Sequence, residues 1–583
     1  MVGGLRAQDE GREVVLAGWV HRRRDLGGLL FVDLRDRSGL VQVSLGPDWT
    51  DAASLEVGHR VGAEDVVRVR GTVHLRPDEA RNPELATGDI EVRAASLEVL
   101  NEADTPAIPV YRQPDEELPA EELRLRHRVL DLRRPELRDN LLLRHRLILA
   151  ARNYLDAQGF VEVETPILTK PTPEGARDFL VPSRVHRGEF FALPQSPQIY
   201  KQILMAAGFD RYFQIARCFR DEDMRADRQP EFTQIDVEAS FVGPEDIFRW
   251  MEGLMTALAA EAPGVEAVAP FERLTWADAL EAYGTDRPDT RFGLRLEDVS
   301  APLADLDFGI VRGALDAGGR VRAFVVPGGA TLSRKQIEAI ETAAKDTGAP
   351  GLLWCKRTDE GGSGPLSRFL AEGHYEALGL APGDLLLAAA GADAVTSPAL
   401  DAARRAAREA AGVPFEREHA WLWVTEFPVF EPGEDGALTS NHHPFVMPHP
   451  DDLDRLESDP LSVRGLAYDL VYNGAELGSG SVRIHRPELQ RRVLRLLGLD
   501  DEAIDDKFGF LLGALASGAP PHGGVAFGMD RIVMLFARAG SLRDVIAFPK
   551  TTAARALFEG APIPVADGDL RELGLRKEIP ADG

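Results

Sequence analysis

Residues 217–238 are the segment that most constrains how this chain can fold. Two runs in which apolar and polar residues alternate flank a loop crowded with arginines and carboxylates. Such alternation predicts two strands, and a loop of that charge density is typical of a site for a phosphate-bearing ligand. Much later in the chain, residues 523–534 form a glycine-rich strand that delivers Arg531 to the start of an apolar helix.

Each of these segments also has a simpler interpretation. A charged loop between strands is most often a solvated hairpin, and a Gly-Gly pair before a helix is most often a turn. A third segment accompanies them, a helix and strand that end in a proline at residues 160–166. In chain order, the three segments resemble motifs 1, 2 and 3 of the class II aminoacyl-tRNA synthetases, whereas the simpler interpretation predicts no order at all.

Length and composition predict a multidomain protein. With 583 residues, 44% of them hydrophobic, the chain has material for several buried cores, or about four domains of about 150 residues each. No apolar run approaches the roughly 20 residues that span a bilayer, and the first residues lack the apolar core of a signal peptide, so we expect a cytoplasmic protein without membrane contact. Cys218 and Cys355 cannot build a disulfide framework, and neither has zinc-finger spacing.

The net charge of −27 argues against non-specific binding to nucleic acid. Any contact with nucleic acid must therefore be locally basic. Two segments qualify, the arginine cluster at residues 21–24 and the arginine-rich run at residues 124–146. Either could also be an ordinary solvated face, which is the commoner role of charge runs.

The first hundred residues predict a small barrel. Five short runs with strand patterning are separated by Gly, Asp and Pro turns: residues 14–20, 29–34, 40–45, 66–73 and 90–99. Five such strands predict an OB-fold domain over residues 1–104. This fold binds nucleic acid on one face, with aromatic side chains that stack on bases and basic groups that meet the backbone.

Residues 22–36 resemble the anticodon-binding domain of bacterial aspartyl-tRNA synthetases. The resemblance implies that Phe31 stacks on an anticodon base, although on pattern alone Phe31 fits a core aromatic equally well. The expected anticodon contacts are Arg24, Leu26, Phe31, Gln42 and Glu79.

The remaining chain predicts a catalytic domain interrupted by an insertion. A linker at residues 105–139 precedes an amphipathic helix at about 140–157, and the catalytic domain is expected over residues 140–291 and 417–583. Between them, residues 292–416 predict an α+β domain with strands at 321–326, 351–355 and 385–389 and helices at 333–345 and 398–411. Its position resembles the inserted, GAD-type domain of bacterial aspartyl-tRNA synthetases. The fold class is multidomain α+β, with a largely antiparallel catalytic sheet implied by the resemblance.

Four further blocks resemble the same family: residues 172–178, 195–198 with Lys201, 441–445 and 478–485. The implied chemistry is activation of L-aspartate by ATP to aspartyl-adenylate, followed by transfer to the 3′ end of tRNA(Asp).

The resemblance also implies an aspartate site. Arg483 would grip the side-chain carboxylate bidentately, and Lys201 would add a compact positive charge. Glu174, Gln198 and Asp236 would surround the ammonium. The full expected set is Glu174, Ser196, Gln198, Lys201, Arg220, Asp236, His442 and Arg483. Because His442 and His443 are adjacent, the sequence leaves open which of them faces the substrate.

Attack on the α-phosphorus builds charge on phosphate oxygens, so this chemistry needs fixed cations more than a base. Arg220 fits the α-phosphate and Arg531 the γ-phosphate; these are the predicted catalytic residues. The expected ATP contacts are Arg220, Asp221, Glu222, Gln229, Glu476, Gly528, Met529, Asp530 and Arg531. Asp469 and Glu476 flank an Asn-Gly pair that predicts a hairpin, and the resemblance makes them Mg²⁺ ligands.

Selectivity against asparagine is expected from charge, because a neutral amide would leave the buried Arg483 and Lys201 without a counter-charge. A site of this kind discriminates by roughly 10⁴–10⁵, so no editing domain is expected.

Other classes of protein remain open at this point. A non-catalytic tRNA-binding relative would be expected to have lost Arg220, Arg483 or Arg531, and all three are present. An enzyme that makes asparagine on the same scaffold has no use for an OB-fold domain. Asparaginyl and lysyl synthetases are disfavoured by the insertion and by the block at 441–444, both on resemblance alone.

Two expectations concern partners. Motif 1, with Pro166 at its end, predicts a homodimer interface, although such a helix and strand could equally be internal to one subunit. Relaxed members of the family, which also charge tRNA(Asn), often carry His at the position of Leu26 and Gly near Glu79. The chain has neither, so we expect strict charging of tRNA(Asp); the alternatives are relaxed Asp/Asn charging and a Leu26 that merely caps the barrel.

Overall fold

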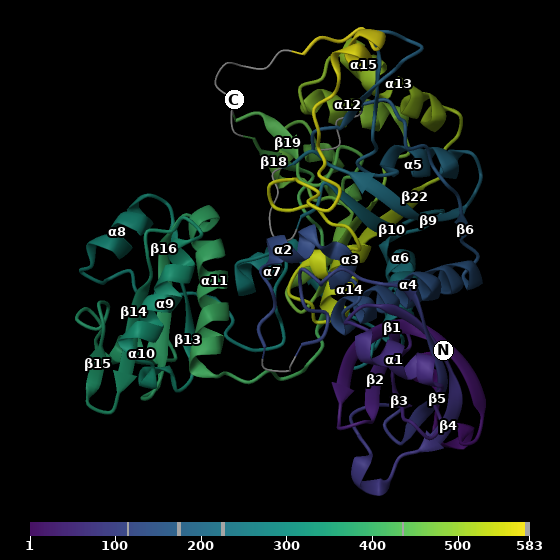
Figure 1. Cartoon of the computed structure of the whole chain (residues 1–583). Helices are drawn as coiled ribbons and strands as arrows, with labels where there is room; N and C mark the ends of the chain where they lie inside the picture. The colour runs from purple at the N-terminus through teal and green to yellow at the C-terminus, as the bar shows by residue number, and fades with distance from the viewer. Residues whose placement is uncertain (113–115, 172–175, 223–227, 434–435, 578–583) are drawn as a thin grey trace. The chain divides into compact units, whose positions relative to one another are not determined.

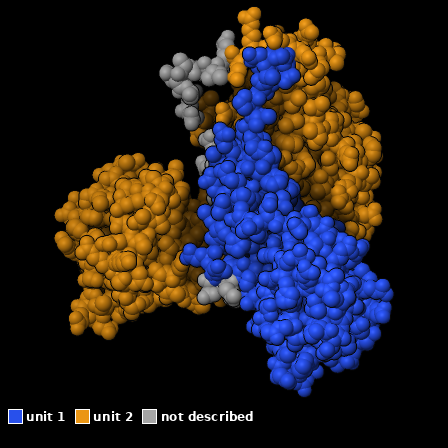
Figure 2. Space-filling model, viewed as in Figure 1, with its two compact units in different colours: residues 1–145, 223–230, 537–570 blue, residues 146–222, 231–536, 571–583 orange. Residues whose placement is uncertain are grey.

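The structure is a computed structural model that describes residues 1–112, 116–171, 176–222, 228–433 and 436–577 (Figure 1). The chain divides into two compact units (Figure 2). The first comprises residues 1–145, 223–230 and 537–570, and the second comprises residues 146–222, 231–536 and 571–583. Within the described ranges, no helix is both long and apolar enough to cross a membrane.

The first unit contains a closed five-stranded barrel, drawn in purple in Figure 1. Its strands run in the order β1-β2-β3-β5-β4, and only the β3–β5 pair is parallel. The strand bounds are β1 (Glu13–Asp25), β2 (Leu30–Asp36), β3 (Gly39–Leu45), β4 (Val66–Leu75) and β5 (Ile90–Asn101), with α1 (Ala52–Arg60) between β3 and β4. Alternate residues fill the barrel, for example Val32 and Leu34 of β2, which are fully buried. The predicted OB fold is confirmed.

Short helices and one irregular segment complete the first unit. These are α2 (Glu121–Arg126), α3 (Arg128–Asp131), the first part of α4 (Pro135–Ala157) and the 3₁₀ turn η7 (Leu542–Asp544). Helix α4 begins at Pro135, five residues before the predicted start at Asn140. Proline suits the first turn of a helix, because its φ is already helical and its missing N–H would have no partner there.

The second unit is built on an eight-stranded sheet in the order β11-β17-β20-β21-β22-β10-β9-β6. The two outermost pairs are parallel and all the others are antiparallel. The strand bounds are β6 (Val161–Glu162), β9 (Arg211–Phe219), β10 (Glu231–Ser240), β11 (Glu272–Thr275), β17 (Trp421–Thr425), β20 (Ala467–Tyr472), β21 (Ala475–Val482) and β22 (His522–Gly528). The predicted, largely antiparallel catalytic sheet is confirmed.

Helices and two small ribbons accompany this sheet. The helices are α5 (Gln198–Ala206), α6 (Pro244–Ala259), α7 (Trp276–Tyr283), α12 (Pro487–Leu496), α13 (Asp501–Ala516), α14 (Met529–Phe536) and α15 (Asp567–Glu572), which begins in the first unit and ends in the second. The ribbons pair β7 (Leu180–Pro182) with β8 (Phe190–Ala192) and β18 (Phe430–Pro432) with β19 (Leu438–Ser440).

A second sheet, in the order β12-β13-β16-β14-β15, lies in the inserted segment. Its elements are β12 (Glu297–Asp298), α8 (Gly309–Asp316), β13 (Arg320–Val326), α9 (Arg334–Lys345), β14 (Leu353–Thr358), β15 (Gly361–Ser363), α10 (Glu372–Ala377), β16 (Leu385–Gly391) and α11 (Asp393–Ala411). Alternate residues of β13 enter two cores, Phe324 and Val326 beside α9 and α11, Val321 and Ala323 beside α8 and α10. Both faces of this sheet are therefore covered.

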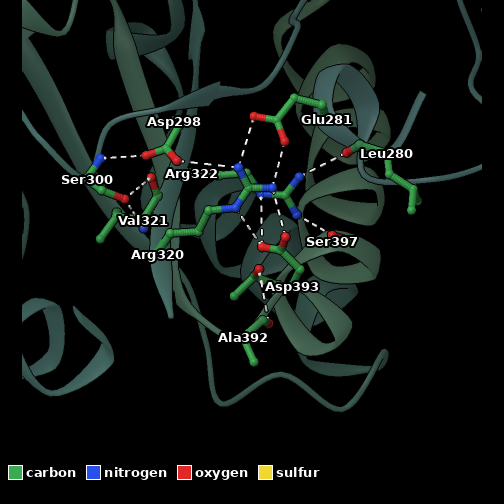
Figure 3. A network of polar contacts seen from close by, with 11 residues as sticks. Leu280, Glu281, Asp298, Ser300, Arg320, Val321, Arg322, Ala392, Asp393 and Ser397 are labelled. Carbon is green, nitrogen blue, oxygen red and sulfur yellow. Dashed lines mark hydrogen bonds and ion pairs between the residues drawn. The ribbon is translucent and has the colours of Figure 1, made fainter. Parts of the chain in front are cut away.

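Two arginines of β13 tie the inserted sheet to α7 (Figure 3). The Arg320 guanidinium pairs bidentately with Glu281 of α7, at 3.0 and 2.6 Å, and with Asp393 at the start of α11, at 2.9 and 2.8 Å. Arg322 is almost fully buried and donates to the Leu280 carbonyl of α7 at 2.9 Å. Buried arginines need such partners, so these contacts fix the position of β13 against α7.

Candidate active site

The site is built on the middle strands of the large sheet. Strands β9 and β10 form the predicted charged hairpin, and β10 also pairs with β22, which runs directly into α14. Both the hairpin and the strand-to-helix turn expected from the sequence are confirmed. The register places Asp236 opposite Ala526 and Glu238 opposite Gly524. A Cβ at Gly524 would lie 2.2 Å from Glu238 Oε2, so glycine leaves the space for this carboxylate.

Four buried charges form the floor of the site. Lys201 Nζ of α5 lies 2.7 Å from Asp236 Oδ1 and 3.3 Å from Glu238 Oε2. Arg483 holds Glu238 with two bonds, Nε to Oε1 at 3.0 Å and Nη2 to Oε2 at 3.2 Å, and donates to Ser481 Oγ at 2.6 Å. All four charged side chains are at most 2% exposed. Two cations and two carboxylates thus cancel in a dry setting, as buried charges require.

The two carboxylates of this cluster respond differently to burial. Burial raises the pKa of the Asp236 carboxyl, and Lys201 only partly opposes it. Burial acts on Glu238 in the same direction, but Arg483 and Lys201 outweigh it and hold the pKa of Glu238 below its ordinary value. Glu238 is therefore the fixed counter-ion of Arg483, and Asp236 is the carboxylate whose charge an added cation would stabilise most.

The adjacent histidines contact different charges. His442 Nε2 lies 3.0 Å from Asp469 Oδ1. Burial acts to lower the pKa of His442, but the negative charges of Asp469 and Glu476 outweigh burial, so the pKa of His442 is raised above its ordinary value. His443 Nε2 lies 2.7 Å from Arg483 Nη1, and burial together with Arg483 holds the pKa of His443 well below its ordinary value. Arginine only donates, so Nε2 of His443 is the acceptor in this contact, and Nδ1 lies 3.2 Å from the Phe445 amide. Both histidines belong to the site.

Three buried polar atoms point to a ligand. Gln198 Nε2, Arg220 Nε and His442 Nδ1 have no hydrogen-bond partner among the residues that the structure describes. A buried polar atom without a partner costs about 1–3 kcal/mol. All three residues were predicted to bind the amino acid substrate. Their unpaired atoms are what a binding site for a small polar molecule requires.

The arginines predicted to meet phosphates are positioned by neighbouring groups. The Arg220 guanidinium lies 5.1 Å from the Phe232 ring, and the Asp221 amide donates to the Arg177 carbonyl at 3.0 Å. Arg531 Nη1 donates to the Glu476 carbonyl at 2.6 Å, which fixes this arginine against β21.

Among the other predicted nucleotide contacts, two side chains serve the fold. The Asp530 carboxylate accepts from the Thr233 amide at 2.9 Å and ties α14 to β10, and Met529 is fully buried. Gly528 ends β22 with no atom closer than 3.7 Å to the position of a Cβ. Glu222, which was also predicted to contact ATP, lies in the described part of the charged loop.

Asp469 and Glu476 lie on the two strands of the predicted hairpin, β20 and β21. Asn473 and Gly474 of the turn have φ of 51° and 81°, as an Asn-Gly hairpin turn requires. Burial, reinforced by Asp469, raises the pKa of the Glu476 carboxyl, and Arg531 partly opposes this. In the described ranges, no three His, Cys, Asp or Glu side chains are grouped to hold a metal by themselves. Two carboxylates that repel each other do fit Mg²⁺ shared with substrate phosphates.

Four further predicted residues remain to be placed. Glu174 lies outside the described residues. Gln229 belongs to the first unit, where its carboxamide pairs with the backbone of Lys550, with Nε2 to O at 3.0 Å and Oε1 to N at 2.9 Å. Ser196 Oγ accepts from the Gln198 amide at 2.8 Å, just before α5. Pro166 is exposed.

Three of the predicted anticodon residues, Arg24, Phe31 and Gln42, lie together on the barrel strands. Arg24 pairs in register with Phe31, and its guanidinium lies 5.7 Å from that ring. The same guanidinium donates to Asp33 Oδ1 and Gln42 Oε1, both at 3.0 Å. Phe31 is half-buried between fully buried neighbours, so it is not a core aromatic. Leu26, in the β1–β2 turn, is 67% exposed and does not cap the barrel, and Glu79 is exposed.

Two site residues were not predicted from the sequence, Glu238 and His443. Glu238 follows Asp236 by two positions on one strand, so strand periodicity places both on the same face. That pattern could have found Glu238. For His443, no local signal separates it from His442.

Comparison with known proteins assigns the class. Residues 120–552 match the family described as tRNA synthetases class II (D, K and N), and residues 14–100 match the OB-fold nucleic acid binding domain. The chain therefore belongs to the class II tRNA synthetases.

Among similar proteins, the aspartate–tRNA(Asp/Asn) ligase of Moorella thermoacetica is 51% identical over 98% of this chain and 96% of that protein. The aspartate–tRNA ligase of Geobacillus kaustophilus is 49% identical over 98% of this chain and 97% of that protein. Asparaginyl-tRNA synthetase from Pyrococcus horikoshii has a similar fold, with a TM-score of 0.60 at 18% identity over 94% of this chain and 96% of that one.

Proposed function

We propose that this enzyme activates L-aspartate with ATP and transfers it to tRNA(Asp), as an aspartyl-tRNA synthetase. The observation that carries the proposal is the buried Lys201–Asp236–Glu238–Arg483 cluster beside unpaired polar atoms of Gln198, Arg220 and His442. The substrate has an ammonium and two carboxylates, which require opposite charges held close together. The names of the similar proteins support the same amino acid.

In this site the side-chain carboxylate of aspartate takes the donors that remain on the two cations. Lys201 has three N–H groups; one donates to Asp236 Oδ1 at 2.7 Å, and Glu238 Oε2 lies 3.3 Å away as an ion pair. Arg483 has five and uses two on Glu238, one on Ser481 and one on His443. Among the residues that the structure describes, each cation therefore keeps at least one donor for the substrate. The ammonium goes to Asp236, whose carboxylate gains most from an added cation.

This arrangement changes the reason for rejecting asparagine. From the sequence, a neutral amide is expected to leave Lys201 and Arg483 without a counter-charge. Their counter-charges are in fact supplied by Asp236 and Glu238. Discrimination instead comes from the amide NH₂, a donor that would face the remaining N–H donors and leave them unpaired.

Activation follows from fixed cations. The α-carboxylate attacks the α-phosphorus of ATP and pyrophosphate leaves, so negative charge grows on phosphate oxygens. Arg220 stabilises the α-phosphate. Arg531, which donates to the Glu476 carbonyl, stabilises the γ-phosphate. Asp221, Glu222, Gln229, Gly528, Met529 and Asp530 complete the proposed nucleotide contacts, the buried Met529 through its backbone. Asp469 and Glu476 would hold Mg²⁺, which supplies further positive charge to the phosphates.

Pyrophosphate exchange tests the proposal directly. The purified enzyme is offered each of the twenty amino acids with ATP and labelled pyrophosphate. We expect exchange with L-aspartate alone, and only with Mg²⁺ present. Exchange with asparagine or lysine, or none with any amino acid, would refute the assignment.

The same proposal includes the choice of tRNA, the location and assembly of the enzyme, and its division into domains. The enzyme charges tRNA(Asp) strictly, because Leu26 offers no hydrogen bond to the alternative anticodon base; similar proteins carry both the Asp and the Asp/Asn names. It acts in the cytoplasm as a homodimer with Pro166 in the interface. The division into residues 1–104, 105–139, 140–291, 292–416 and 417–583 is part of the proposal as well.

A further inference from the structure

Five consecutive backbone carbonyls in the first unit, those of residues 543–547, accept hydrogen bonds from the side chains of Arg128, Asn140 and Arg144. Arg128 of α3 donates to the carbonyls of Arg543 at 2.7 Å, Ile546 at 2.8 Å and Ala547 at 2.9 Å. The Asp544 carbonyl accepts from Asn140 Nδ2 at 3.1 Å, and the Val545 carbonyl from Arg144 Nη1 at 3.4 Å. An irregular segment must satisfy its carbonyls in some way, and here one arginine satisfies three of the five.

Arg128 is built into this position. Its side chain is 2% exposed, and its remaining nitrogen pairs with Asp131 Oδ2 at 2.7 Å. Burial lowers the pKa of Arg128, and the buried Asp131 beside it opposes this and keeps the guanidinium charged. Only a planar fork with five N–H donors can reach three carbonyls and a carboxylate at once.

The held segment ends close to Gln229. Three residues after Ala547, the backbone of Lys550 exchanges two hydrogen bonds with the Gln229 carboxamide. Pro549, with its fixed φ, lies between them and limits independent motion. Gln229 is 7% exposed, and within the described residues one N–H and one lone pair of its carboxamide remain for another partner.

We propose that Arg128 is a positioning residue for nucleotide binding: by fixing the carbonyls of residues 543, 546 and 547, it sets the Lys550 backbone that orients the Gln229 carboxamide. This inference rests on the proposed contact between Gln229 and ATP. Arg128 itself touches neither ATP nor aspartate in this scheme. Its replacement therefore weakens ATP binding and spares aspartate binding.

Arg128→Lys is the informative variant, because lysine keeps the charge for Asp131 but lacks the fork. The matched control is Arg322→Lys, another buried arginine that donates to a backbone carbonyl. Asn140→Ala is a milder second variant that releases only the Asp544 carbonyl, in case Arg128→Lys folds poorly.

Hydrogen exchange of the full-length enzyme without substrates is the first measurement. We expect the Lys550 amide, which donates to Gln229, to exchange about tenfold faster in Arg128→Lys, less so in Asn140→Ala and unchanged in Arg322→Lys. Unchanged exchange at Lys550 in both Arg128→Lys and Asn140→Ala overturns the inference.

Pyrophosphate exchange is the second measurement. We expect the KM for ATP to rise about tenfold in Arg128→Lys, with the KM for aspartate and kcat nearly unchanged. Combining Arg128→Lys with Gln229→Ala should add nothing to the effect of Gln229→Ala alone, because both act through one contact. Additive effects, or KM values for ATP and aspartate that rise together, overturn the inference.

The two measurements separate this inference from the proposed function. If the wild-type enzyme shows no exchange with L-aspartate, the function is wrong, and the substrate-free hydrogen exchange alone decides whether Arg128 holds Gln229. If Gln229→Ala leaves the KM for ATP unchanged while aspartate activation is intact, the nucleotide role of Arg128 is refuted and the aspartate function stands.

Discussion

Glu238 is the residue on which both buried cations of the site depend. It bonds Arg483 through both carboxylate oxygens and also lies 3.3 Å from Lys201. Without it, Arg483 would be a buried charge held only by Ser481 and His443, which is strongly unfavourable. The two cations and two carboxylates of this cluster therefore balance one another, and aspartate, with one ammonium and two carboxylates, brings one net negative charge to them.

Substitution of Arg483 should separate aspartate binding from ATP binding. Arg483→Lys keeps the charge but loses the bidentate pairing with Glu238 and the donor left for substrate. We expect the KM for aspartate in pyrophosphate exchange to rise about 10²-fold, with the KM for ATP within about twofold. Arg483→Leu should abolish aspartate activation. The control is Arg492→Lys, at a surface pair with Glu457. An unchanged aspartate requirement in both variants would remove Arg483 from the pocket.

His443 should contribute to the acid sensitivity of the fold. Burial and Arg483 depress the pKa of His443, so the folded protein keeps it neutral while the unfolded chain binds a proton below about pH 6.5. The stabilisation is thus present above pH 6.5 and is lost as pH falls through that value towards the folded pKa. In His443→Gln, which still accepts from Arg483, we expect a smaller fall in Tm between pH 7.5 and 5.5 than in wild type. The exposed His59→Gln is the control; an equal fall in His443→Gln would contradict the prediction.

At the scale of single elements, the β1–β2 turn carries Leu26, the residue proposed to decide which tRNA is charged. Leu26 N donates to the Leu29 carbonyl at 3.0 Å, and Gly27 and Gly28 adopt φ of 71° and 110°. The glycines shape the turn, and the exposed Leu26 side chain adds nothing to the barrel core. Its replacement should therefore leave stability within about 0.5 kcal/mol. The position is free to serve recognition.

Leu26→His tests this role. An imidazole in the turn can donate to an anticodon base that leucine ignores, so we expect the variant to aspartylate tRNA(Asn) transcripts more efficiently while tRNA(Asp) charging stays nearly the same. The measurement is kcat/KM for both transcripts. Val15→His, which places an imidazole at another exposed position of β1, is the control. Comparable charging of both transcripts by the wild-type enzyme would disprove strict specificity.

At the scale of the whole molecule, sequence periodicity predicted the helices and strands better than it predicted the contacts between residues far apart in the chain. The barrel strands, the charged hairpin, the Asn-Gly hairpin and the glycine-rich strand each follow from local patterns. Glu238 and Arg483 are 245 positions apart, and Arg128 and Ala547 are 419 apart. Such pairs depend on sheet register and on how irregular segments pack, which no local pattern encodes. For the same reason, the sequence did not predict that Lys201 pairs with Asp236 and that Arg483 pairs with Glu238.

Assembly is the remaining prediction at this scale. In the second unit, Ile167 and Leu168, which follow Pro166, are 42% and 50% exposed, and Leu149 of α4 and Val161 of β6 are 49% and 48% exposed. Apolar side chains exposed so close together along the chain indicate an interaction surface, and a two-fold axis would pair the surface with itself. We expect light scattering at micromolar concentration to give twice the 63.7 kDa of one chain.

The surface can be tested with a charge. Leu168→Asp should shift the protein towards the monomer, because burying two unpaired carboxylates across a two-fold axis is costly. Val268→Asp, at an exposed apolar residue elsewhere in the second unit, should leave the dimer intact. A wild-type protein that scatters as a monomer would refute the dimer, and a Leu168→Asp variant that remains dimeric would place the interface elsewhere.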